Sequence, residues 1–260
     1  MAVQSLPEKW HGLRDQDIRY RRRYVDLFSN PEVMEGFLAR SRIVSAIRAF
    51  LVERGFLEVE TPMMQAIPGG AVARPFSTYH NALDMDLFLR IAPELNLKRL
   101  IVGGLEKVYE IAKDFRNQGM DRTHNPEFTI LEWYRPGWDH HRLMDEVDEL
   151  LQAVLDTVPG ERLTYAEAFV RHAGFDPHHA TDHDLRGRVD ALGAADSEGL
   201  RRDDLLDLIL THEIEPQLGA ARPTFVHDYP GSQAALARVR DGEPPLAERF
   251  EAFVSGVELA

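Results

Sequence analysis

Hydrophobic positions recur with helical spacing in two long segments of the chain. In residues 37–54 the apolar side chains fall at i, i+4, i+7 and i+8, on one side of a helix: Ile43, Ile47, Phe50 and Leu51. Gly55 follows this segment and supplies a stop signal. Residues 139–155 show a similar stripe, formed by Leu143, Val147, Leu150, Leu151 and Val154. We therefore predict an amphipathic helix in each segment.

Other segments alternate between apolar and polar residues, which is typical of strands. They are residues 56–60, 86–93, 107–116, 127–134 and 223–229. Residues 107–116 and 127–134 are joined by a polar turn and are predicted to form one hairpin. A second hairpin is predicted around Ser255-Gly256, which fits a two-residue turn. In that register Phe253 opposes Glu258, so Glu251 and Glu258 share a sheet face, with Cβ atoms roughly 7 Å apart.

Between the two hairpins the chain reads as mostly helical. Thr164 and Glu167 have the spacing of a capping box, Thr181 with Asp184 indicates another helix start, and residues 203–215 are rich in apolar positions. We predict an α+β fold in four parts: an N-terminal linker or arm at 1–36, a core at 37–138, a helical insertion at 139–220, and C-terminal strands of the core at 221–260.

Composition narrows the functional classes. The 260-residue chain is 44% hydrophobic and 28% charged, as expected of a globular protein, and has no cysteine, which excludes disulfides, thiolate catalysis and Cys-ligated zinc. A net charge of −13 disfavours a free-standing nucleic-acid binder. The basic run at 19–24 is either a solvated helix face or a contact to a polyanion. With no long apolar run and no leader, we expect a cytoplasmic protein without membrane contact.

The first hairpin carries the strongest candidate chemistry. Arg116 closes its first strand and Phe128 begins its second, and a guanidinium beside an aromatic ring suits a nucleotide's phosphate and base. Glu132 and Tyr134 lie further along the same face and suit an amine ligand.

Weaker signals leave alternatives open. Glu94 is a site carboxylate or a solvated one, and the turn at 68–71 is a close backbone approach to a ligand or a plain turn. Glu251 and Glu258 could hold Mg²⁺ on a polyphosphate or form a solvated face. The pairs His140-His141 and His178-His179 lack metal-motif spacing and are predicted to be surface histidines.

Several longer segments carry a family likeness. EVETPMM at 58–64, IPGGAVARPF at 67–76, RIAPEL at 90–95, and FRN at 115–117 with HNPEF at 124–128 resemble the catalytic core of class II lysyl-tRNA synthetases. From LEWYRP at 131–136 onward, the chain is closer to the synthetase paralogue that lysylates elongation factor P. RLMDEVDELLQ at 142–152 and RPTFVHDYP at 222–230 carry that second likeness. The resemblance covers nearly the whole chain and implies an antiparallel sheet flanked by helices.

The resemblance also implies roles for individual residues. Arg116 would bind the α-phosphate of ATP and stabilise charge in catalysis. The base and the other phosphates would contact Gln118, which stands where the family has Glu, together with His124, Asn125 and Phe128. The amino end of lysine would be held by Gly70, Glu94 and Glu132, and its side chain would be lined by Tyr134. Glu251 and Glu258 would carry Mg²⁺.

The implied reaction joins lysine and ATP to give lysyl-adenylate, followed by transfer to elongation factor P or tRNA(Lys). A homodimer contact through the 37–54 helix is also implied. The sequence stops at Ala260, before the third motif of the family and the glutamate that receives lysine's side-chain ammonium. We therefore expect this truncated chain to activate lysine poorly. The alternative is a non-catalytic module that binds ATP or dimerises.

Overall fold

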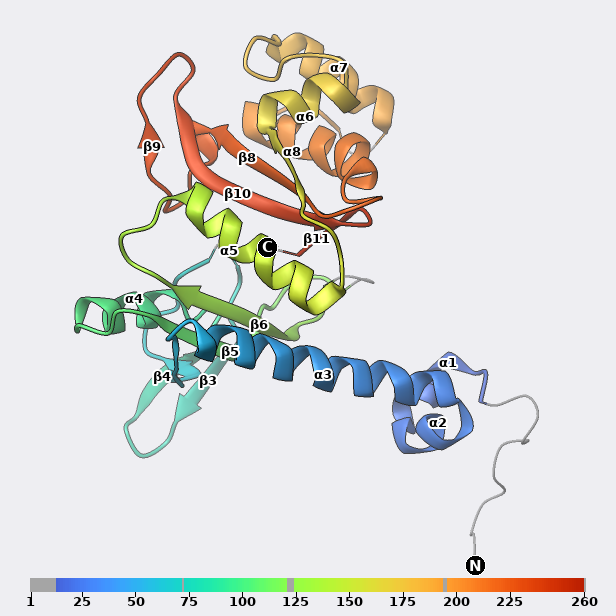
Figure 1. The fold of residues 1–260 in the computed structure, drawn as a ribbon, viewed down its shortest axis with the longest axis vertical. Coiled ribbons are helices and arrows are strands. Elements are labelled where there is room, and N and C mark those ends of the chain that lie inside the picture. Colours follow the sequence, from blue (N-terminus) through green and yellow to red (C-terminus); the bar gives the residue numbers. More distant parts are fainter. Residues whose placement is uncertain (1–12, 72, 121–123, 194–195, 260) are drawn as a thin grey trace, which may run out of the picture. The chain divides into compact units, whose positions relative to one another are not determined.

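A computed structural model of the chain describes residues 13–71, 73–120, 124–193 and 196–259. The chain divides into two compact units, Met1–Pro136 (unit 1) and Gly137–Ala260 (unit 2). Figure 1 shows the elements of both units. Part of the predicted N-terminal arm, residues 1–12, lies outside the described residues.

Unit 1 combines helices with two small sheets. Its helices are α1 (Gln16–Arg21), α2 (Arg23–Ser29), α3 (Pro31–Glu53) and α4 (Glu94–Val102). One sheet has the order β1-β5-β6, formed by β1 (Leu57–Glu58), β5 (Val108–Phe115) and β6 (Glu127–Tyr134). The other has the order β2-β4-β3, formed by β2 (Met64–Gln65), β4 (Met85–Leu89) and β3 (Ser77–His80).

The predicted β5–β6 hairpin is confirmed to within one residue. The two strands are antiparallel, with Asp114 opposite Phe128 and Glu110 opposite Glu132. β1 pairs with β5 in parallel. Because side chains alternate along a strand, Phe128, Glu132 and Tyr134 share one face of the hairpin. The opposite face lies against α3 (Figure 1), where Arg40 Nη2 donates to Thr129 Oγ1 at 3.1 Å.

The helix predicted over 37–54 is confirmed and begins earlier than expected. α3 starts at Pro31, because proline is tolerated in a first helical turn where its missing N–H has no partner to lose. It ends before Gly55, whose φ of +78° lies in the left-handed region. Only Phe50 and Leu51 of α3 are buried, while Ile43 is exposed.

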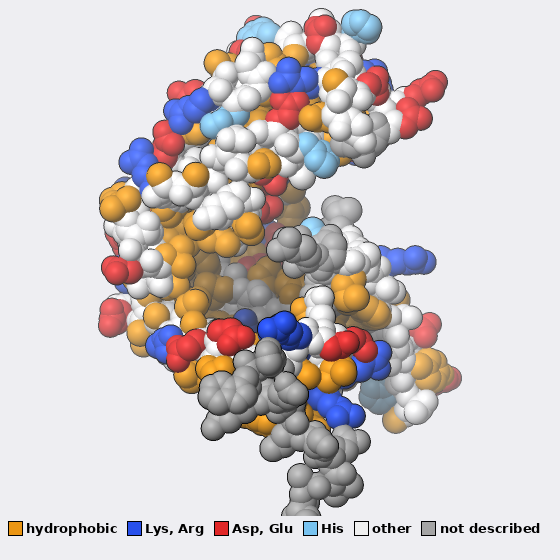
Figure 2. Space-filling model, turned by 90° about the vertical axis from the view of Figure 1, so that its right-hand side faces the viewer, with side chains coloured by type: hydrophobic (Ala, Val, Ile, Leu, Met, Phe, Trp, Pro, Cys, Tyr) orange, Lys and Arg blue, Asp and Glu red, His pale blue; other side chains and the backbone are white. Residues whose placement is uncertain are grey.

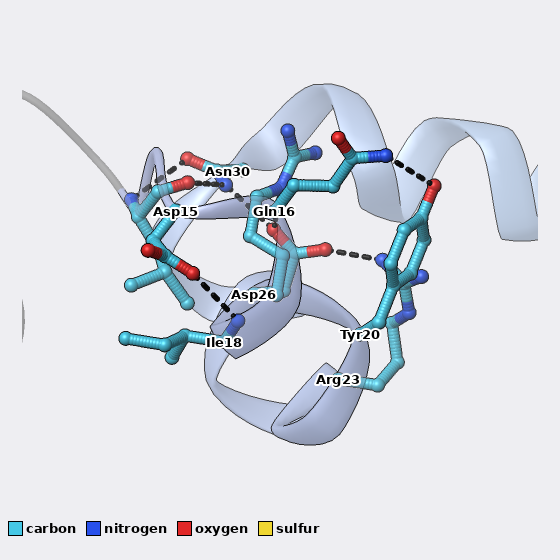
Figure 3. Close-up of polar contacts among 9 residues, drawn as sticks. Asp15, Gln16, Ile18, Tyr20, Arg23, Asp26 and Asn30 are labelled. Atoms are coloured by element: carbon cyan, nitrogen blue, oxygen red, sulfur yellow. Dashed lines mark hydrogen bonds and ion pairs between the residues drawn. The ribbon is translucent and has the colours of Figure 1, made fainter.

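The predicted arm is helical where it is described, and it encloses a buried carboxylate. Asp26 of α2 is fully buried, with Arg19 Nε 2.8 Å from its Oδ1 and Arg23 Nη1 bonded to its Oδ2 (Figure 3). Asn30 Nδ2 donates to the same carboxylate at 2.6 Å. Burial works to raise the pKa of Asp26, but these hydrogen bonds and the two arginines outweigh it and hold the pKa below its usual value.

Arg19 and Arg23 of the basic run therefore bind the carboxylate of Asp26. This pairing argues against a contact between the run and a polyanion. The tyrosines of that run, Tyr20 and Tyr24, are 63% and 69% exposed. The interpretation as a solvated face is correct in part, because two arginines of the run pair with an aspartate that is fully buried.

Unit 2 is built on one sheet with the order β11-β10-β8-β7, and β9 pairs with β10. Its strands are β7 (Glu161–Thr164), β8 (Thr224–Pro230), β9 (Val239–Arg240), β10 (Leu246–Val254) and β11 (Val257–Glu258). Its α-helices are α5 (His140–Leu155), α6 (Tyr165–His172), α7 (Asp182–Leu192) and α8 (Arg202–Ile209). The chain continues from α8 through a π-helix, η1 (Leu210–Ile214), and two 3₁₀ turns lie at η2 (Glu215–Gln217) and η3 (Gly231–Gln233).

The segment predicted as a helical insertion contributes to this sheet as well. β7 lies within residues 139–220 and pairs in parallel with β8, and the unit boundary falls at Pro136/Gly137. Four residues are too few for periodicity to reveal such a strand. Two helix starts are confirmed: Thr164 and Glu167 form a capping box, and the Thr181 side chain accepts from the Asp184 N–H.

Charged side chains of both signs are interspersed on the face of the molecule shown in Figure 2. Ion pairs within unit 2 include Arg188 with Glu213 and Arg238 with Glu248. Across the described residues, no helix combines the length and hydropathy needed to cross a bilayer.

Candidate active site

The five residues predicted to bind ATP line one pocket of unit 1. This pocket has a volume of about 340 Å³ and lies where β5 ends and β6 begins. Its walls are Arg116, Gln118, Gly119, His124, Asn125, Phe128 and Thr129. The hairpin thus gathers all five side chains, because the register brings the end of β5 beside the start of β6.

Arg116 is held at the edge of this pocket by the strand ladder. Its backbone N–H donates to the Pro126 carbonyl at 2.9 Å, one step beyond β5. Its guanidinium carbon lies 5.0 Å from the centre of the Phe128 ring, and its Nε donates to the Ile91 carbonyl at 3.4 Å. The pocket therefore presents a cation beside an aromatic face, which suits a phosphate group and a planar base.

A buried ionic network underlies this end of the hairpin. Arg90 follows β4 and is 2% exposed; its Nη1 lies 2.7 Å from Glu110 Oε1 and its Nε 3.1 Å from Asp114 Oδ1. Arg90 Nη1 also donates to the carbonyl and hydroxyl of Thr61, at 3.1 and 3.0 Å. The network links the segments that carry Glu94 and Arg116, since the Phe115 N–H donates to the Arg90 carbonyl at 3.0 Å.

The sequence patterns did not predict this network. Burial raises the pKa of Asp114 to about 6, against the opposing effect of Arg90 and Arg116. The available signal was a charged residue inside an otherwise apolar strand pattern, at Arg90, Glu110 and Asp114.

The residues predicted to bind lysine also lie close together in unit 1. A Cβ on Gly70 would stand 3.2 Å from the Cβ atoms of both Ala92 and Glu94, and Gly70 has a φ of +94°. Only glycine combines that backbone conformation with so close an approach. Glu94 in turn accepts from Lys98 Nζ at 2.5 Å, and this ammonium lies 5.8 Å from the centre of the Tyr134 ring.

Lys98 was not among the residues predicted to bind lysine. Its position four residues after Glu94 on α4 could have indicated this contact, because such residues are neighbours on a helix. Its ammonium shows that a primary amine fits between a carboxylate and the Tyr134 ring. Nearby, Tyr134 Oη donates to Glu132 Oε1 at 2.6 Å. Burial raises the pKa of Glu132 to about 7, and the neighbouring Glu94 charge adds to that shift. An added ammonium beside Glu132 would favour its ionised form, as Lys98 does for Glu94.

The two predicted metal ligands belong to unit 2 and line a separate pocket of about 400 Å³. The register is as predicted, with Phe253 opposite Glu258, and Ser255 and Gly256 both have positive φ, at 53° and 74°. Besides Glu251 and Glu258, the pocket is lined by two further carboxylates, Asp207 and Glu215.

Glu251 already has protein partners in this pocket. Tyr229 Oη donates to its Oε2 at 2.5 Å, and Arg249 Nη2 is bonded to its Oε1. Burial raises the pKa of Asp207 to about 6 and also raises that of Glu215, and the Glu251 charge contributes to both shifts. Carboxylate oxygens are hard ligands of the kind that Mg²⁺ prefers, and an ion here would share Glu251 with Arg249. Among the described residues, these four carboxylates do not form a group of three whose oxygens all lie within 4.8 Å of one another.

The hairpin, with its pocket around Arg116 and Phe128, belongs to a class II synthetase core. Residues 15–260 match the family model described as tRNA synthetases class II (D, K and N), and the chain belongs to this family.

The chain is also similar to curated lysine–tRNA ligases. It is 50% identical to that of Magnetococcus marinus, and 48% identical to those of Moorella thermoacetica and Teredinibacter turnerae. The alignments cover all of this chain and 55%, 56% and 56% of these relatives. The chain therefore spans little more than half the length of the relatives it matches.

Proposed function

We propose that this chain carries the ATP-binding and lysine-binding region of a ligase that activates lysine. The observation that carries the proposal is the gathering of Arg116, Gln118, His124, Asn125 and Phe128 in one pocket. The similarity to lysine–tRNA ligases supports lysine as the amino acid.

In the proposed reaction, an oxygen of lysine's carboxylate attacks the α-phosphorus of ATP. A new P–O bond forms, the bond to the β-phosphate breaks, and pyrophosphate leaves with the negative charge. The guanidinium of Arg116 stabilises the charge on the α-phosphate oxygens as it develops. Phe128 stacks on adenine and fixes the nucleotide for this step. No side-chain nucleophile is required.

Lysine is proposed to bind at the acidic cluster of unit 1. Its α-ammonium would be held by Glu94 and Glu132, beside the backbone of Gly70, and Tyr134 would line its side chain. The contact between Lys98 and Glu94 supports this arrangement, because it places one ammonium beside the same carboxylate and ring.

Mg²⁺ is proposed to bind in the pocket of unit 2, with Glu251 and Glu258 as ligands. An ion held by these two carboxylates would supply positive charge for a polyphosphate. Asp207 and Glu215 line the same pocket and add to its negative potential.

The adenylate would then deliver lysine to an acceptor. The similarity to lysine–tRNA ligases favours tRNA(Lys), and the paralogue-like segments from residue 131 onward favour elongation factor P. Incubation with radiolabelled lysine, ATP and either acceptor separates the two. Labelling of neither acceptor would favour a module that binds ATP without catalysis.

A homodimer is part of the same proposal, with α3 contributing to the contact. The exposed apolar side chains Met34, Phe37, Leu38 and Ile43 on this helix support it. Light scattering after size exclusion should give twice the chain mass, and Phe37→Glu should give the monomer.

ATP binding is the direct test of the nucleotide site. We expect calorimetry with ATP and Mg²⁺ to show one site, and Arg116→Ala to weaken it by about tenfold to hundredfold through loss of a charge-assisted hydrogen bond. Arg21→Ala is the matched control, because Arg21 pairs with Asp17 on α1 and lies outside the pocket. Equal affinities for the Arg116 and Arg21 variants would refute the site. Lysine-dependent pyrophosphate exchange on the same variants then tests catalysis.

A further inference from the structure

Three histidines that are far apart in the sequence converge in unit 2. His140 and His141 open α5, and His227 lies on β8. One ring nitrogen from each lies within 4.8 Å of the nitrogens of the other two. The ring centres of His140 and His141 are 4.0 Å apart, and those of His141 and His227 are 5.4 Å apart. His140 is buried, so our prediction of two surface histidines was wrong for this residue.

An irregularity in the sheet brings Asp228 to the same cluster. Neighbouring residues on a regular strand point to opposite faces. The pairing of β8 with β10 shifts register between Ala247 and Phe250, and Asp228 adopts a φ of +58°. As a result, His227 Nδ1 and His140 Nε2 lie 3.3 Å from the two carboxylate oxygens of Asp228. Arg240 Nη2, at 3.2 Å, balances the charge of this carboxylate.

The hydrogen bonding of His140 leaves one nitrogen without a protein partner. Asp228 Oδ1 accepts from Nε2, which leaves the lone pair on Nδ1. That Nδ1 is buried and makes no hydrogen bond to any described residue. A carboxylate bonded to the far nitrogen of a ligating histidine is the usual support of a metal site, because it fixes the tautomer and raises the basicity of the ligand.

We propose that His140, His141 and His227 bind a divalent transition-metal ion, with Zn²⁺ as the reference case. The ion would tie the first turn of α5 to β8, and Asp228 would orient its ligands. Three imidazoles suit Zn²⁺ and its first-row neighbours, and they leave a fourth position for water. Nitrogens bound at about 2.0–2.1 Å in a tetrahedral site lie roughly 3.4 Å apart, so modest side-chain rotations close the cluster.

The charge state of the histidines is compatible with metal binding. Burial lowers the pKa of both His140 and His227 below the usual value. This direction favours the neutral imidazole, which is the form that binds a metal ion. The three histidines do not line the pocket that contains Glu251 and Glu258, the residues proposed to bind Mg²⁺, and their nitrogens select a softer ion.

The test uses the full 260-residue chain without a histidine tag, freed of metal by a chelator and then dialysed. We expect one saturable Zn²⁺ site per chain by competition with a chromophoric chelator, and tetrahedral-type visible bands on titration with Co²⁺. His141→Ala should weaken Zn²⁺ binding by at least about tenfold. Asp228→Asn should weaken it by about tenfold to hundredfold, which is typical of residues that support metal ligands.

His183→Ala is the matched control, since His183 is also exposed, at the start of α7, and lies outside the cluster. Zn²⁺ should raise the Tm of the wild type and of this control, and leave that of His141→Ala unchanged. Because His141 is exposed, its metal-free variant should melt with the wild type. The proposal is overturned by non-saturable binding, or by Zn²⁺ affinities that are equal in the wild type and in His141→Ala.

Discussion

Replacing Arg90 by leucine tests how the buried network supports the candidate site. The substitution removes the guanidinium that contacts both buried carboxylates, Glu110 and Asp114, which are 4% and 0% exposed. Removing one partner of a buried pair costs about 3–5 kcal/mol, because the remaining charge stays in a medium that solvates it poorly. The hydrogen bonds to Thr61 are lost as well. We therefore expect the free energy of unfolding at pH 8 to fall by about 3–5 kcal/mol.

The size of that loss should depend on pH in a defined direction. The pKa of Asp114 is raised to about 6 from its ordinary 3.8, so its ionisation opposes folding, and stability is lost as the pH rises through 6. At pH 5 the carboxyl is largely protonated and needs no cation. The difference in unfolding free energy between wild type and Arg90→Leu should therefore be smaller at pH 5 than at pH 8.

Urea unfolding at both pH values, followed by circular dichroism, measures these differences. Arg48→Leu is the matched control, because Arg48 forms an exposed ion pair with Glu58, 49% and 38% exposed, and such pairs contribute about 0–1 kcal/mol. A loss for Arg90→Leu within about 1 kcal/mol of this control at pH 8 would refute the reasoning. So would equal losses at the two pH values, since the protonation of Asp114 would then be irrelevant.

Three further outcomes are expected. Burial raises the pKa of Glu132 to about 7, so lysine affinity measured by calorimetry should rise from pH 6 to pH 8 as the carboxylate ionises, and Glu132→Gln should flatten the profile. Thr164→Ala should lower the unfolding free energy by about 1 kcal/mol in urea, because it removes the cap of α6; an unchanged midpoint would contradict this. Gly219→Ala should lower the Tm, because the added Cβ would stand 2.5 Å from the Phe253 carbonyl oxygen and the backbone φ is +70°. We expect this strain to cost about 1–3 kcal/mol. A Tm equal to that of the wild type would show that the backbone relaxes around the new methyl group.

Sequence patterns correctly predicted the elements that are stabilised by interactions between residues close together in the chain. Alternation and the intervening polar turn predicted the β5–β6 hairpin, whose register places Asp114 opposite Phe128. The spacing of Thr164 and Glu167 predicted a helix start, because a capping box is satisfied within four residues. The Ser255-Gly256 turn belongs to the same group, since two consecutive positive φ values determine which residues face each other.

The burial of charged side chains could not be predicted from neighbouring residues in the sequence. Asp26 follows the basic run that we interpreted as a solvated face, Arg90 lies in a segment predicted as a strand, and both residues are buried. Burial of a charge depends on the partners that reach it, and these come from elsewhere: Arg19, Arg23 and Asn30 in the first case, Glu110 and Asp114 in the second. Composition cannot show which arginine meets which carboxylate.

Local sequence patterns alone were enough to predict the hairpin around Arg116. Strand periodicity and turn residues act over a few positions, and together they place Arg116 beside Phe128 in any fold that keeps the pairing. The histidine cluster was decided only by the tertiary structure. His140 and His227 are 87 positions apart, and the shifted register at Asp228 turns its side chain toward them. Contacts of that kind depend on how the first turn of α5 packs against β8, which no local spacing records.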